Sequence, residues 1–238
     1  MALSPLHIGI VGCSAEGAAL CYRTICIEGP DILGPHAHPE VSMHTHSLAK
    51  YMELLEKGDL CGVGDLMLSS AQKLAAAKAD FLICPDNTIH SAFAYVEEKS
   101  PLPWLHIADV VAGEALMLGF HTLGLLGTRW LVESGVYPEK LKARALESVR
   151  PNTTECEKID RIIFEELVYG LFKPESVAYL QHVIARLKRE GCDAVILGCT
   201  ELPLVIDDSN SVLPALDSAR LLARAALGRA THKRPGVH

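Results

Sequence analysis

Two stretches of this chain repeat each other, and this repeat restricts the possible fold more than any other feature. The run Ile8–Gly12 resembles Leu123–Gly127, and Ala79–Cys84 resembles Cys192–Leu197. In both halves the first run precedes the second by about the same chain length. Short, continuous apolar runs are typical of strands buried on both faces of a parallel sheet. The repeat therefore predicts two equivalent lobes. The alternative is that any two strand–helix–strand units resemble each other to this degree.

Helical patterns alternate with apolar runs along the chain. Strands are expected at His7–Gly12, Glu40–Thr45, Phe81–Cys84, Leu105–Ile107, Thr122–Gly127 and Ala194–Leu197. Helices are expected at Ala15–Ile27, Ser47–Lys57, Ser70–Ala79, Asn87–Glu98, Ile159–Tyr169, Pro174–Arg189 and Ser218–Leu227. Alternation of this kind predicts an α/β fold in which helices cover both faces of parallel sheets.

The expected architecture is a pair of pseudosymmetric lobes, each a parallel sheet flanked by helices. We expect an N-terminal lobe of residues 1–108 plus 213–238, because the last helix returns to it, and a C-terminal lobe of residues 109–212. Ligands of such sheets bind beyond the carboxyl ends of the strands. The active site is therefore expected in a cleft between the two lobes.

Composition excludes several classes of protein. The formal charge is -7 and the only basic cluster is Lys233-Arg234, so no nucleic-acid partner is expected. No apolar run approaches the roughly 18 residues of a membrane span, so no membrane partner is expected. Residues 1–13 lack a basic region and a cleavage site, and the 8 cysteines show no C-x-x-C spacing. These features predict a cytoplasmic protein with reduced thiols.

Polar side chains follow two of the expected strands at matching positions. One strand leads into Cys84-Pro85-Asp86-Asn87-Thr88, and its counterpart leads into Gly198-Cys199-Thr200-Glu201. Superposing the strands makes Asp86 and Cys199 equivalent. A carboxylate and a thiol are thus expected on facing walls of one cleft, each followed by hydroxyl or amide donors.

The segment Gly198-Cys199-Thr200-Glu201-Leu202-Pro203, preceded by Gly191–Leu197, resembles the second active-site motif of the aspartate/glutamate racemase family. Leu126–Arg129 and Glu133–Tyr137 resemble its aspartate racemase branch, and Asn87-Thr88 resembles its first motif. The similarity runs from about His7 to Leu227. It implies a two-base racemase that acts on an amino acid or related carboxylate without a cofactor, most simply as a homodimer.

The first motif departs from the family pattern, because Asp86 stands where most members have a cysteine. Three interpretations follow. Asp86 is the second base and racemisation persists, or Cys199 alone moves protons in a decarboxylation or isomerisation of a non-amino-acid carboxylate, or the site binds a small molecule without turnover. Cys84 is expected to be a buried strand residue rather than a displaced base.

Removing a proton from the carbon beside a carboxylate requires a base and stabilisation of the carbanion. Only the thiolate of a cysteine is basic, and its ordinary pKa is about 8.5, so a helix N-terminus expected after Cys199 would lower its pKa. The ordinary pKa of an aspartate is about 3.9, so Asp86 needs burial or a neighbouring negative charge to become a useful base. The two groups are expected to titrate as a coupled pair.

Other residues are candidates for binding the substrate. Asn87, Thr88 and Thr200 are expected to hold its carboxylate, with Ser14 assisting or capping the first helix. Glu201 is expected to contact the substrate ammonium group or to cap the next helix. His46, or its neighbour His44, is expected beside the substrate side chain. Lys173 stands where the family often has a residue that reaches the far end of the substrate.

Several further interpretations are weaker on chemical grounds. Gly9, Gly12 and Gly17 lack the G-x-G-x-x-G spacing of a nicotinamide site, and the histidines between residues 36 and 46 lack a settled ligand geometry, so no metal is expected. His90 either tunes Asp86 or is a solvated helix residue, the latter being favoured. The stretch Pro30–Thr45 holds no lysine or arginine. Aspartate or glutamate is therefore a substrate that the family implies, and a neutral amino acid fits as well.

Overall fold

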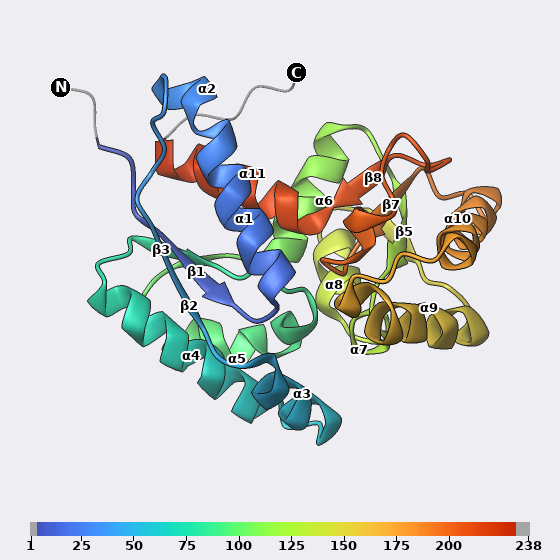
Figure 1. The fold of residues 1–238 in the computed structure, drawn as a ribbon, viewed down its shortest axis with the longest axis horizontal. Helices are drawn as coiled ribbons and strands as arrows, with labels where there is room; N and C mark the ends of the chain where they lie inside the picture. The colour runs from blue at the N-terminus through green and yellow to red at the C-terminus, as the bar shows by residue number, and fades with distance from the viewer. Residues whose placement is uncertain (1–3, 232–238) are drawn as a thin grey trace. The chain divides into compact units, whose positions relative to one another are not determined.

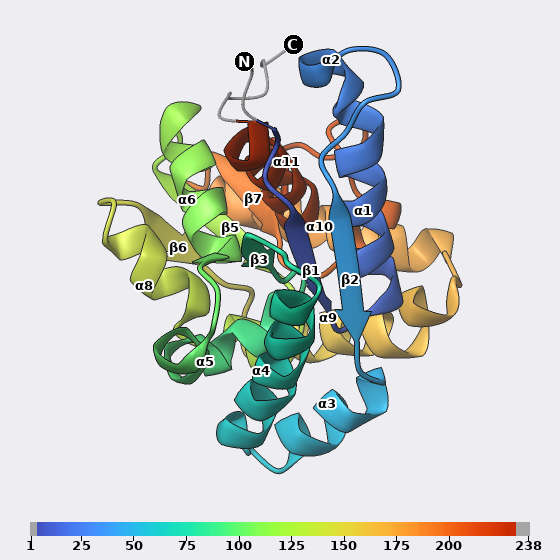
Figure 2. The ribbon, with the colours of Figure 1, turned by 90° about the vertical axis from the view of Figure 1, so that its left-hand side faces the viewer.

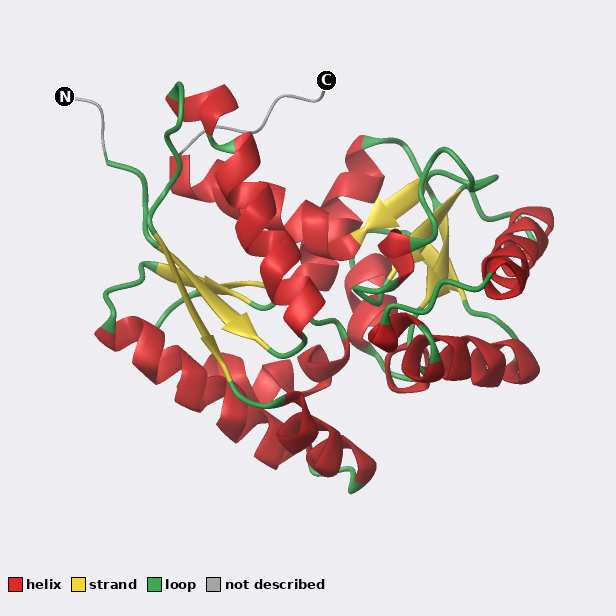
Figure 3. Ribbon diagram, in the orientation of Figure 1, coloured by secondary structure: helices red, strands yellow, loops and turns green. Residues whose placement is uncertain are grey.

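The repeated apolar runs are strands of two parallel sheets, as the sequence predicts. The computed structural model describes residues 4–231, so Lys233, Arg234 and the rest of the C-terminal tail lie outside the described residues. Each sheet has four strands and is flanked by helices (Figure 3). The expected α/β class with two helix-flanked parallel sheets is confirmed. The described residues form two units, 4–107 with 219–231, and 108–218.

The first unit is built on a sheet with strand order β2-β1-β3-β4, in which all pairs are parallel. Figure 2 shows β2, β1 and β3 side by side. The strands are β1 (Ile8–Gly12), β2 (Val41–Thr45), β3 (Phe81–Ile83) and β4 (Trp104–Leu105). The helices are α1 (Ala15–Glu28), α2 (Pro30–Leu33), α3 (Leu48–Glu56), α4 (Leu60–Ala76), η1 (Thr88–Ala92), α5 (Phe93–Lys99) and α11 (Ser218–Thr231), whose first residue belongs to the second unit.

Helices α1 and α11 lie together on one side of this sheet, and α4 and α5 lie on the other (Figure 1). The Cys21 thiol of α1 donates to the carbonyl of Ala219 at 3.2 Å, and Leu6 N donates to the carbonyl of Ala230 at 2.9 Å. These bonds tie the last helix to the beginning of the chain. The expected return of the C-terminal helix to the first unit is therefore present.

The second unit repeats the arrangement with strand order β6-β5-β7-β8, again all parallel. Its strands are β5 (Thr122–Leu126), β6 (Glu147–Val149), β7 (Ala194–Leu197) and β8 (Ala215–Asp217). Its helices are α6 (Ile107–Met117), whose first residue belongs to the first unit, α7 (Arg129–Val132), α8 (Val136–Lys142), α9 (Thr153–Glu165), η2 (Leu167–Tyr169), α10 (Pro174–Arg189) and η3 (Leu202–Leu204).

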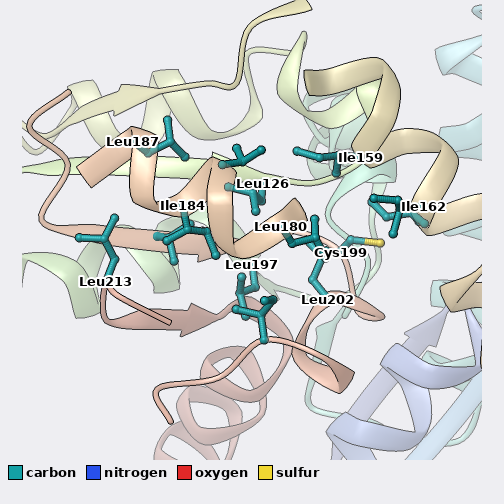
Figure 4. Packing of buried hydrophobic residues seen from close by; sticks show 14 of the residues in the cluster. Leu126, Ile159, Ile162, Leu180, Ile184, Leu187, Leu197, Cys199, Leu202 and Leu213 are labelled. Atoms are coloured by element: carbon teal, nitrogen blue, oxygen red, sulfur yellow. The ribbon is translucent and has the colours of Figure 1, made fainter. Parts of the chain in front are cut away.

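The core of the second unit joins the sheet to α9 and α10. Leu126 and Leu197 of the central strands pack with Ile159 of α9 and with Leu180 and Ile184 of α10, all of them buried (Figure 4). Burial of apolar side chains contributes roughly 25 cal/mol per Å² of area removed from water, so this cluster stabilises the packing of α9 and α10 on the strand β7.

The pairing registers of the two sheets are the same. Ile8 pairs with Phe81 in the first sheet, and its counterpart Leu123 pairs with Ala194 in the second. Asp80 and Asp193, each just before these paired strands, also correspond: each carboxylate accepts a backbone N–H at 2.7 Å, from His7 and His121 respectively. The likeness therefore extends to hydrogen bonds at the strand beginnings, beyond what a shared strand–helix–strand pattern requires.

Helix α4 begins ten residues before the predicted position at Ser70. The Asp59 side chain accepts the Gly62 N–H at 2.9 Å and so caps the helix. A side chain at Gly64 would collide with the ring of Tyr95, because a Cβ there would lie 2.6 Å from it. Gly62 and Gly64 lower the helical propensity of this segment, which is why its sequence does not predict the start of the helix. The close contact with Tyr95 explains why residue 64 is a glycine.

Other boundaries also differ from the sequence prediction. β4 ends at Leu105 and Ile107 begins α6, so the expected strand is shorter. Residues 213–218, which the sequence analysis placed with the first lobe, belong to the second unit because β8 pairs with β7. The short strands β6 and β8 and the helices α6–α8 were not predicted. Their segments are too short or too uniformly apolar to show the alternation of apolar and polar residues that is typical of a strand or a helix. Among residues 4–231, no helix combines the length and apolar character that crossing a bilayer requires.

Candidate active site

In each sheet, the first strand in the chain has the second strand on one side and the third strand on the other, so the strand order reverses there. In the first sheet β2 lies on one side of β1 and β3 on the other, and in the second sheet β6 and β7 flank β5 in the same way. At such a switch point the loops after the two central strands diverge and leave a binding crevice at the carboxyl edge. The residues that follow β1, β3, β5 and β7 are therefore the candidate site residues.

Asp86 and Cys199 occupy the same position in their sheets. Each comes five residues after the first paired residue of its strand, Phe81 in β3 and Ala194 in β7. This register supports the equivalence that the sequence repeat suggested. One switch point thus carries a carboxyl group and the other a thiol.

The loop around Asp86 is held by its own backbone contacts. The Asp86 Oδ1 atom accepts the N–H of Ile89 at 3.2 Å, and His90 Nδ1 lies 2.6 Å from the Asp86 carbonyl oxygen. His90 is only 3 % exposed, so the expected solvated position is wrong. Its Nε2 accepts the N–H of Ile107 at 3.4 Å, which fixes Nδ1 as the protonated nitrogen. His90 therefore holds the Asp86 peptide in place and joins it to the beginning of α6.

Cys84 is fully buried in the first unit, as expected, although β3 ends one residue before it, at Ile83. Its Sγ lies 4.0 Å from the carbonyl oxygen of Asp86. Burial raises the pKa of the Cys84 thiol well above its ordinary value, and the nearby Asp86 raises it further. Cys84 is therefore a neutral thiol at physiological pH and a poor base.

The other candidate residues of the first unit follow the same strands. Ser14 caps α1, and its Oγ accepts the N–H of Gly17 at 3.3 Å. Asn87 is buried and Thr88 half-buried, immediately beyond Asp86. All three lie at the carboxyl ends of the adjacent strands β1 and β3. The first unit thus gathers a hydroxyl, an amide and a carboxyl group at one sheet edge.

His46 follows β2 at the same edge and is half-buried. Its Nε2 lies 3.3 Å from the Ser69 hydroxyl, and its ring stacks edge-on against His44 at a centroid distance of 4.8 Å. Burial, then His44 and the lysines 73 and 50, lower the pKa of His46. The ring is consequently neutral near pH 7, so it offers a hydrogen bond but no full positive charge.

Lys73 is a cation of this edge that the sequence analysis missed. Its Nζ lies 2.9 Å from His44 Nε2, and His44 Nδ1 lies 2.9 Å from the Ser70 hydroxyl. The pKa of His44 is lowered by burial and by Lys73. Residues 30–45 hold no lysine or arginine, whereas Lys73 approaches His44 of β2 from α4. Only the packing of α4 against β2 brings it there.

Cys199 is 9 % exposed and lies at one end of the apolar cluster of the second unit (Figure 4). Its Sγ donates to Glu201 Oε2 at 2.9 Å, and the Thr200 hydroxyl donates to the same oxygen at 2.9 Å. Thr200 and Glu201 are each 6 % exposed. The buried carboxylate of Glu201 is therefore a ready acceptor for the thiol proton.

Two expectations about this segment need correction. The helix expected after Cys199 is only η3, a single turn of three residues, so its dipole is far weaker than that of a full helix. The Glu201 side chain makes no capping hydrogen bond to η3. Its carboxylate instead accepts the hydrogen bond of the Cys199 thiol.

Lys173 precedes α10 and is paired with a carboxylate. Its Nζ lies 3.2 Å from Glu166 Oε1, and its side chain is 49 % exposed. Ser176 donates to Glu166 Oε2 at 2.6 Å, and these two contacts lower the pKa of Glu166. Because α10 leads directly into β7, its first turn points towards the carboxyl edge of the sheet. Lys173 thus lies on the correct side of the second unit, with part of its charge already balanced.

Thr128 is a candidate that the sequence analysis overlooked. It follows β5 as Ser14 follows β1, is buried, and caps α7 by accepting the N–H of Leu131 at 3.3 Å. The signal was present in the repeat, because Gly127 corresponds to Gly12 and Thr128 therefore stands one residue before the position of Ser14. Among residues 4–231, no three histidine, cysteine, aspartate or glutamate side chains gather as metal ligands would.

The fold is that of an α/β protein with two repeated parallel sheets, which carry a carboxyl group and a thiol at equivalent positions. The family model for the Asp/Glu/hydantoin racemases matches residues 10–226. The chain belongs to this family. It is 24% identical over 164 residues to a broad specificity amino-acid racemase of Bacillus subtilis (strain 168), a match that spans 68% of this chain and 69% of the relative.

Solved structures show the same fold over nearly the whole chain. A candidate Asp/Glu racemase from Yersinia pestis has a TM-score of 0.87 at 30% identity, and the match covers 94% of this chain and 99% of that one. An aspartate racemase homologue from Pyrococcus horikoshii OT3 has a TM-score of 0.81 at 30% identity, with the same coverage.

Proposed function

We propose that this protein is an amino-acid racemase that works without pyridoxal phosphate and uses Asp86 and Cys199 as its two acid–base groups. The observation that carries the proposal is their equivalent position, one at the switch point of each repeated sheet. A racemase must handle a proton on either side of Cα, so it needs two groups. A repeat that ends in a carboxyl group in one copy and a thiol in the other supplies that pair.

The reaction runs in two directions through one planar intermediate. In one direction the Cys199 thiolate removes the α-proton and the Asp86 carboxylic acid returns a proton to the opposite face. In the other direction the Asp86 carboxylate removes the proton and the Cys199 thiol returns one. Each direction requires one group protonated and the other not, which suits a coupled pair that shares a single proton.

Glu201 supports the role of Cys199 as a base. A thiol is a weak base, and transferring its proton to the Glu201 carboxylate 2.9 Å away produces the reactive thiolate inside the protein. Donors near the reacting carbon then stabilise the negative charge of the substrate carboxylate. Ser14, Asn87, Thr88 and Thr200 are the groups that we assign to this binding.

We assign an acidic amino acid as the substrate, with aspartate or glutamate as the first candidates. The positive charge of Lys73 near His44 and His46, and Lys173 on the second unit, support this class. The neutral rings of His44 and His46 are equally suited to an uncharged side chain. A panel that includes both kinds of amino acid therefore decides the assignment.

The proposed activity is tested by proton NMR of L- and D-amino acids incubated with the protein in deuterium oxide, without added pyridoxal phosphate. The α-proton signal of both enantiomers of one acidic amino acid is expected to disappear, and the optical rotation is expected to decay to zero. Exchange without loss of rotation would contradict the two-base mechanism. If no amino acid exchanges its α-proton, the racemase proposal is wrong, and malonates become the next panel.

A second prediction concerns Glu201. The Glu201→Gln variant keeps the shape of the side chain but removes the acceptor of the Cys199 proton, so we expect racemisation to fall by about 100-fold. Turnover is measured in both directions with the substrate found above. The control is Glu190→Gln, which removes a carboxylate of the same unit that pairs with Arg186. A loss of activity of equal size in both variants would speak against a specific role for Glu201.

A further inference from the structure

Asp86 and Cys199 stand at equivalent positions, but the main chain around them is held differently. The carbonyl of Cys199 accepts the N–H of Leu202, three residues further on, at 3.2 Å. Ile89 is the counterpart of Leu202 in the first unit and is equally buried, yet its N–H is directed to Oδ1 of Asp86 at 3.2 Å. The carboxylate therefore binds the N–H that, in the second unit, holds the main chain.

His90 supplies a donor to the Asp86 carbonyl instead. Its Nδ1 lies 2.6 Å from that oxygen, and because a carbonyl oxygen only accepts hydrogen bonds, the proton of this contact belongs to Nδ1. Pro203 stands at the corresponding position of the second unit, and its side chain has no donor. The imidazole is thus a feature of the unit that carries the carboxyl group.

The orientation of the His90 ring is fixed from outside the Asp86 loop. Phe93 of α5 stacks on it at a centroid distance of 5.5 Å and an angle of 14° between the ring planes. His106, which follows β4, meets it edge-on at 4.7 Å. At the other nitrogen, Nε2 accepts the N–H of Ile107, the first residue of α6, at 3.4 Å. A buried ring that is held by two other rings and at both nitrogens keeps its Nδ1 donor in a fixed position.

We propose that His90 is a positioning residue for Asp86, which fixes the main chain from which the carboxyl group reaches the α-proton of the substrate. The inference rests on the proposed acid–base role of Asp86. Displacing a catalytic group by about 1 Å can lower a rate by about 100-fold, because proton transfer needs both atoms at hydrogen-bond distance. All the contacts of His90 described above join residues of the first unit. Its loss is therefore expected to act on the half of the reaction in which Asp86 removes the proton.

Two substitutions of His90 separate the hydrogen bond from the ring. The amide nitrogen of an asparagine can occupy nearly the place of Nδ1, whereas the amide of a glutamine reaches the place of Nε2. His90→Asn therefore keeps a donor for the Asp86 carbonyl, and His90→Gln keeps only the group that faces Ile107. Both variants lose the ring contacts with Phe93 and His106, so their melting temperatures are expected to fall by similar amounts. If His90→Gln does not fold, His90→Phe, which keeps a ring without a donor, replaces it with the same expectation.

Racemisation and α-proton exchange of both variants are measured in deuterium oxide with separate L and D samples of the substrate. In His90→Gln we expect the kcat of racemisation to fall by about 10–100-fold and KM to stay within about threefold, because the groups assigned to substrate binding are unchanged. The enantiomer that Asp86 deprotonates is expected to lose its exchange to the same extent, while the one that Cys199 deprotonates still exchanges. In His90→Asn both activities are expected to stay within about fivefold of the unaltered protein.

His7 is the matched control, because it is a buried histidine just before β1, at the opposite edge of the same sheet. Its Nδ1 lies 3.0 Å from the carbonyl oxygen of Lys78, and its Nε2 lies 3.0 Å from the Ser42 hydroxyl. His7→Gln is expected to lower the melting temperature, as His90→Gln does. The exchange of both enantiomers per folded molecule is expected to stay within about twofold, because a loss of stability alone leaves the folded molecules active.

An equal loss of Asp86-dependent exchange in His90→Asn and His90→Gln would overturn the inference, because the position of the donor would then not matter. Full exchange of both enantiomers in a folded His90→Gln protein would also overturn it, as would a loss of the same size in His7→Gln. The proposed function fails separately, through the absence of α-proton exchange in the unaltered protein, and the inference then fails with it.

Discussion

Replacing Cys199 with serine is expected to lower racemisation by about 10³-fold or more, because a serine hydroxyl has nearly the same size but hardly ionises near neutral pH. The Glu201 carboxylate, which accepts the hydrogen bond of the thiol at 2.9 Å, remains in the variant. The packing around residue 199 is therefore expected to change little. Asp86 keeps its own acid–base capacity. The enantiomer that Asp86 deprotonates is therefore still expected to exchange its α-proton with deuterium oxide. The other enantiomer is expected not to exchange, and neither is expected to be inverted.

The matched control for this variant is Cys192→Ser. Cys192 is a buried thiol of the same unit, just before β7, whereas Cys199 comes just after it. Burial and the neighbouring carboxylates raise the pKa of Cys192 to about 11, so it is a neutral thiol at the pH of the assay. Turnover per folded molecule is expected to stay within a few-fold of the unaltered protein. Retained inversion in Cys199→Ser would remove Cys199 from the mechanism.

Replacing Asp86 with asparagine is expected to give the mirror image of that result. Asparagine can neither take up nor deliver a proton at neutral pH, so racemisation falls by about 10²–10⁴-fold. Cys199 and Glu201 remain intact, so the enantiomer that Cys199 deprotonates is expected to exchange its α-proton without inversion. The two variants together then exchange opposite enantiomers, which NMR in deuterium oxide measures with separate L and D samples.

Asp80→Asn is the matched control, because Asp80 stands just before β3 and Asp86 lies beyond its other end. The Asp80 carboxylate accepts the N–H of His7, and an asparagine oxygen can accept it too, so turnover is expected to change little. Unchanged racemisation in Asp86→Asn would show that Asp86 is not a base and would favour a reaction through Cys199 alone. Loss of exchange for both enantiomers would instead make Asp86 a binding residue.

The contrast between Cys84 and His90 shows which parts of the site a sequence can predict. Cys84 continues an uninterrupted apolar run, and such a run is buried wherever it stands in a parallel sheet, so its burial was predictable. His90 lies in a mixed helical segment with no such period. Its burial depends on Phe93 and His106, whose rings pack against it at 5.5 and 4.7 Å. Local pattern cannot provide those partners.

Glu201 shows a second limit. The sequence places Glu201 two residues beyond Cys199, but the direction of its carboxylate depends on the irregular turn after β7, where η3 forms in place of a longer helix.

The sequence by itself determined the α/β class, the two repeated sheets and the equivalence of Asp86 and Cys199. Apolar runs and the spacing between them can be read directly from the chain, and here the same pattern occurs in both halves. The tertiary structure alone decided which groups surround those two residues. Lys73 and His90 reach the sheet edge or the Asp86 peptide from helices whose packing involves residues distant in the chain. Electrostatics and hydrogen bonding act over a few ångströms of space, and distances along the chain do not fix distances in space.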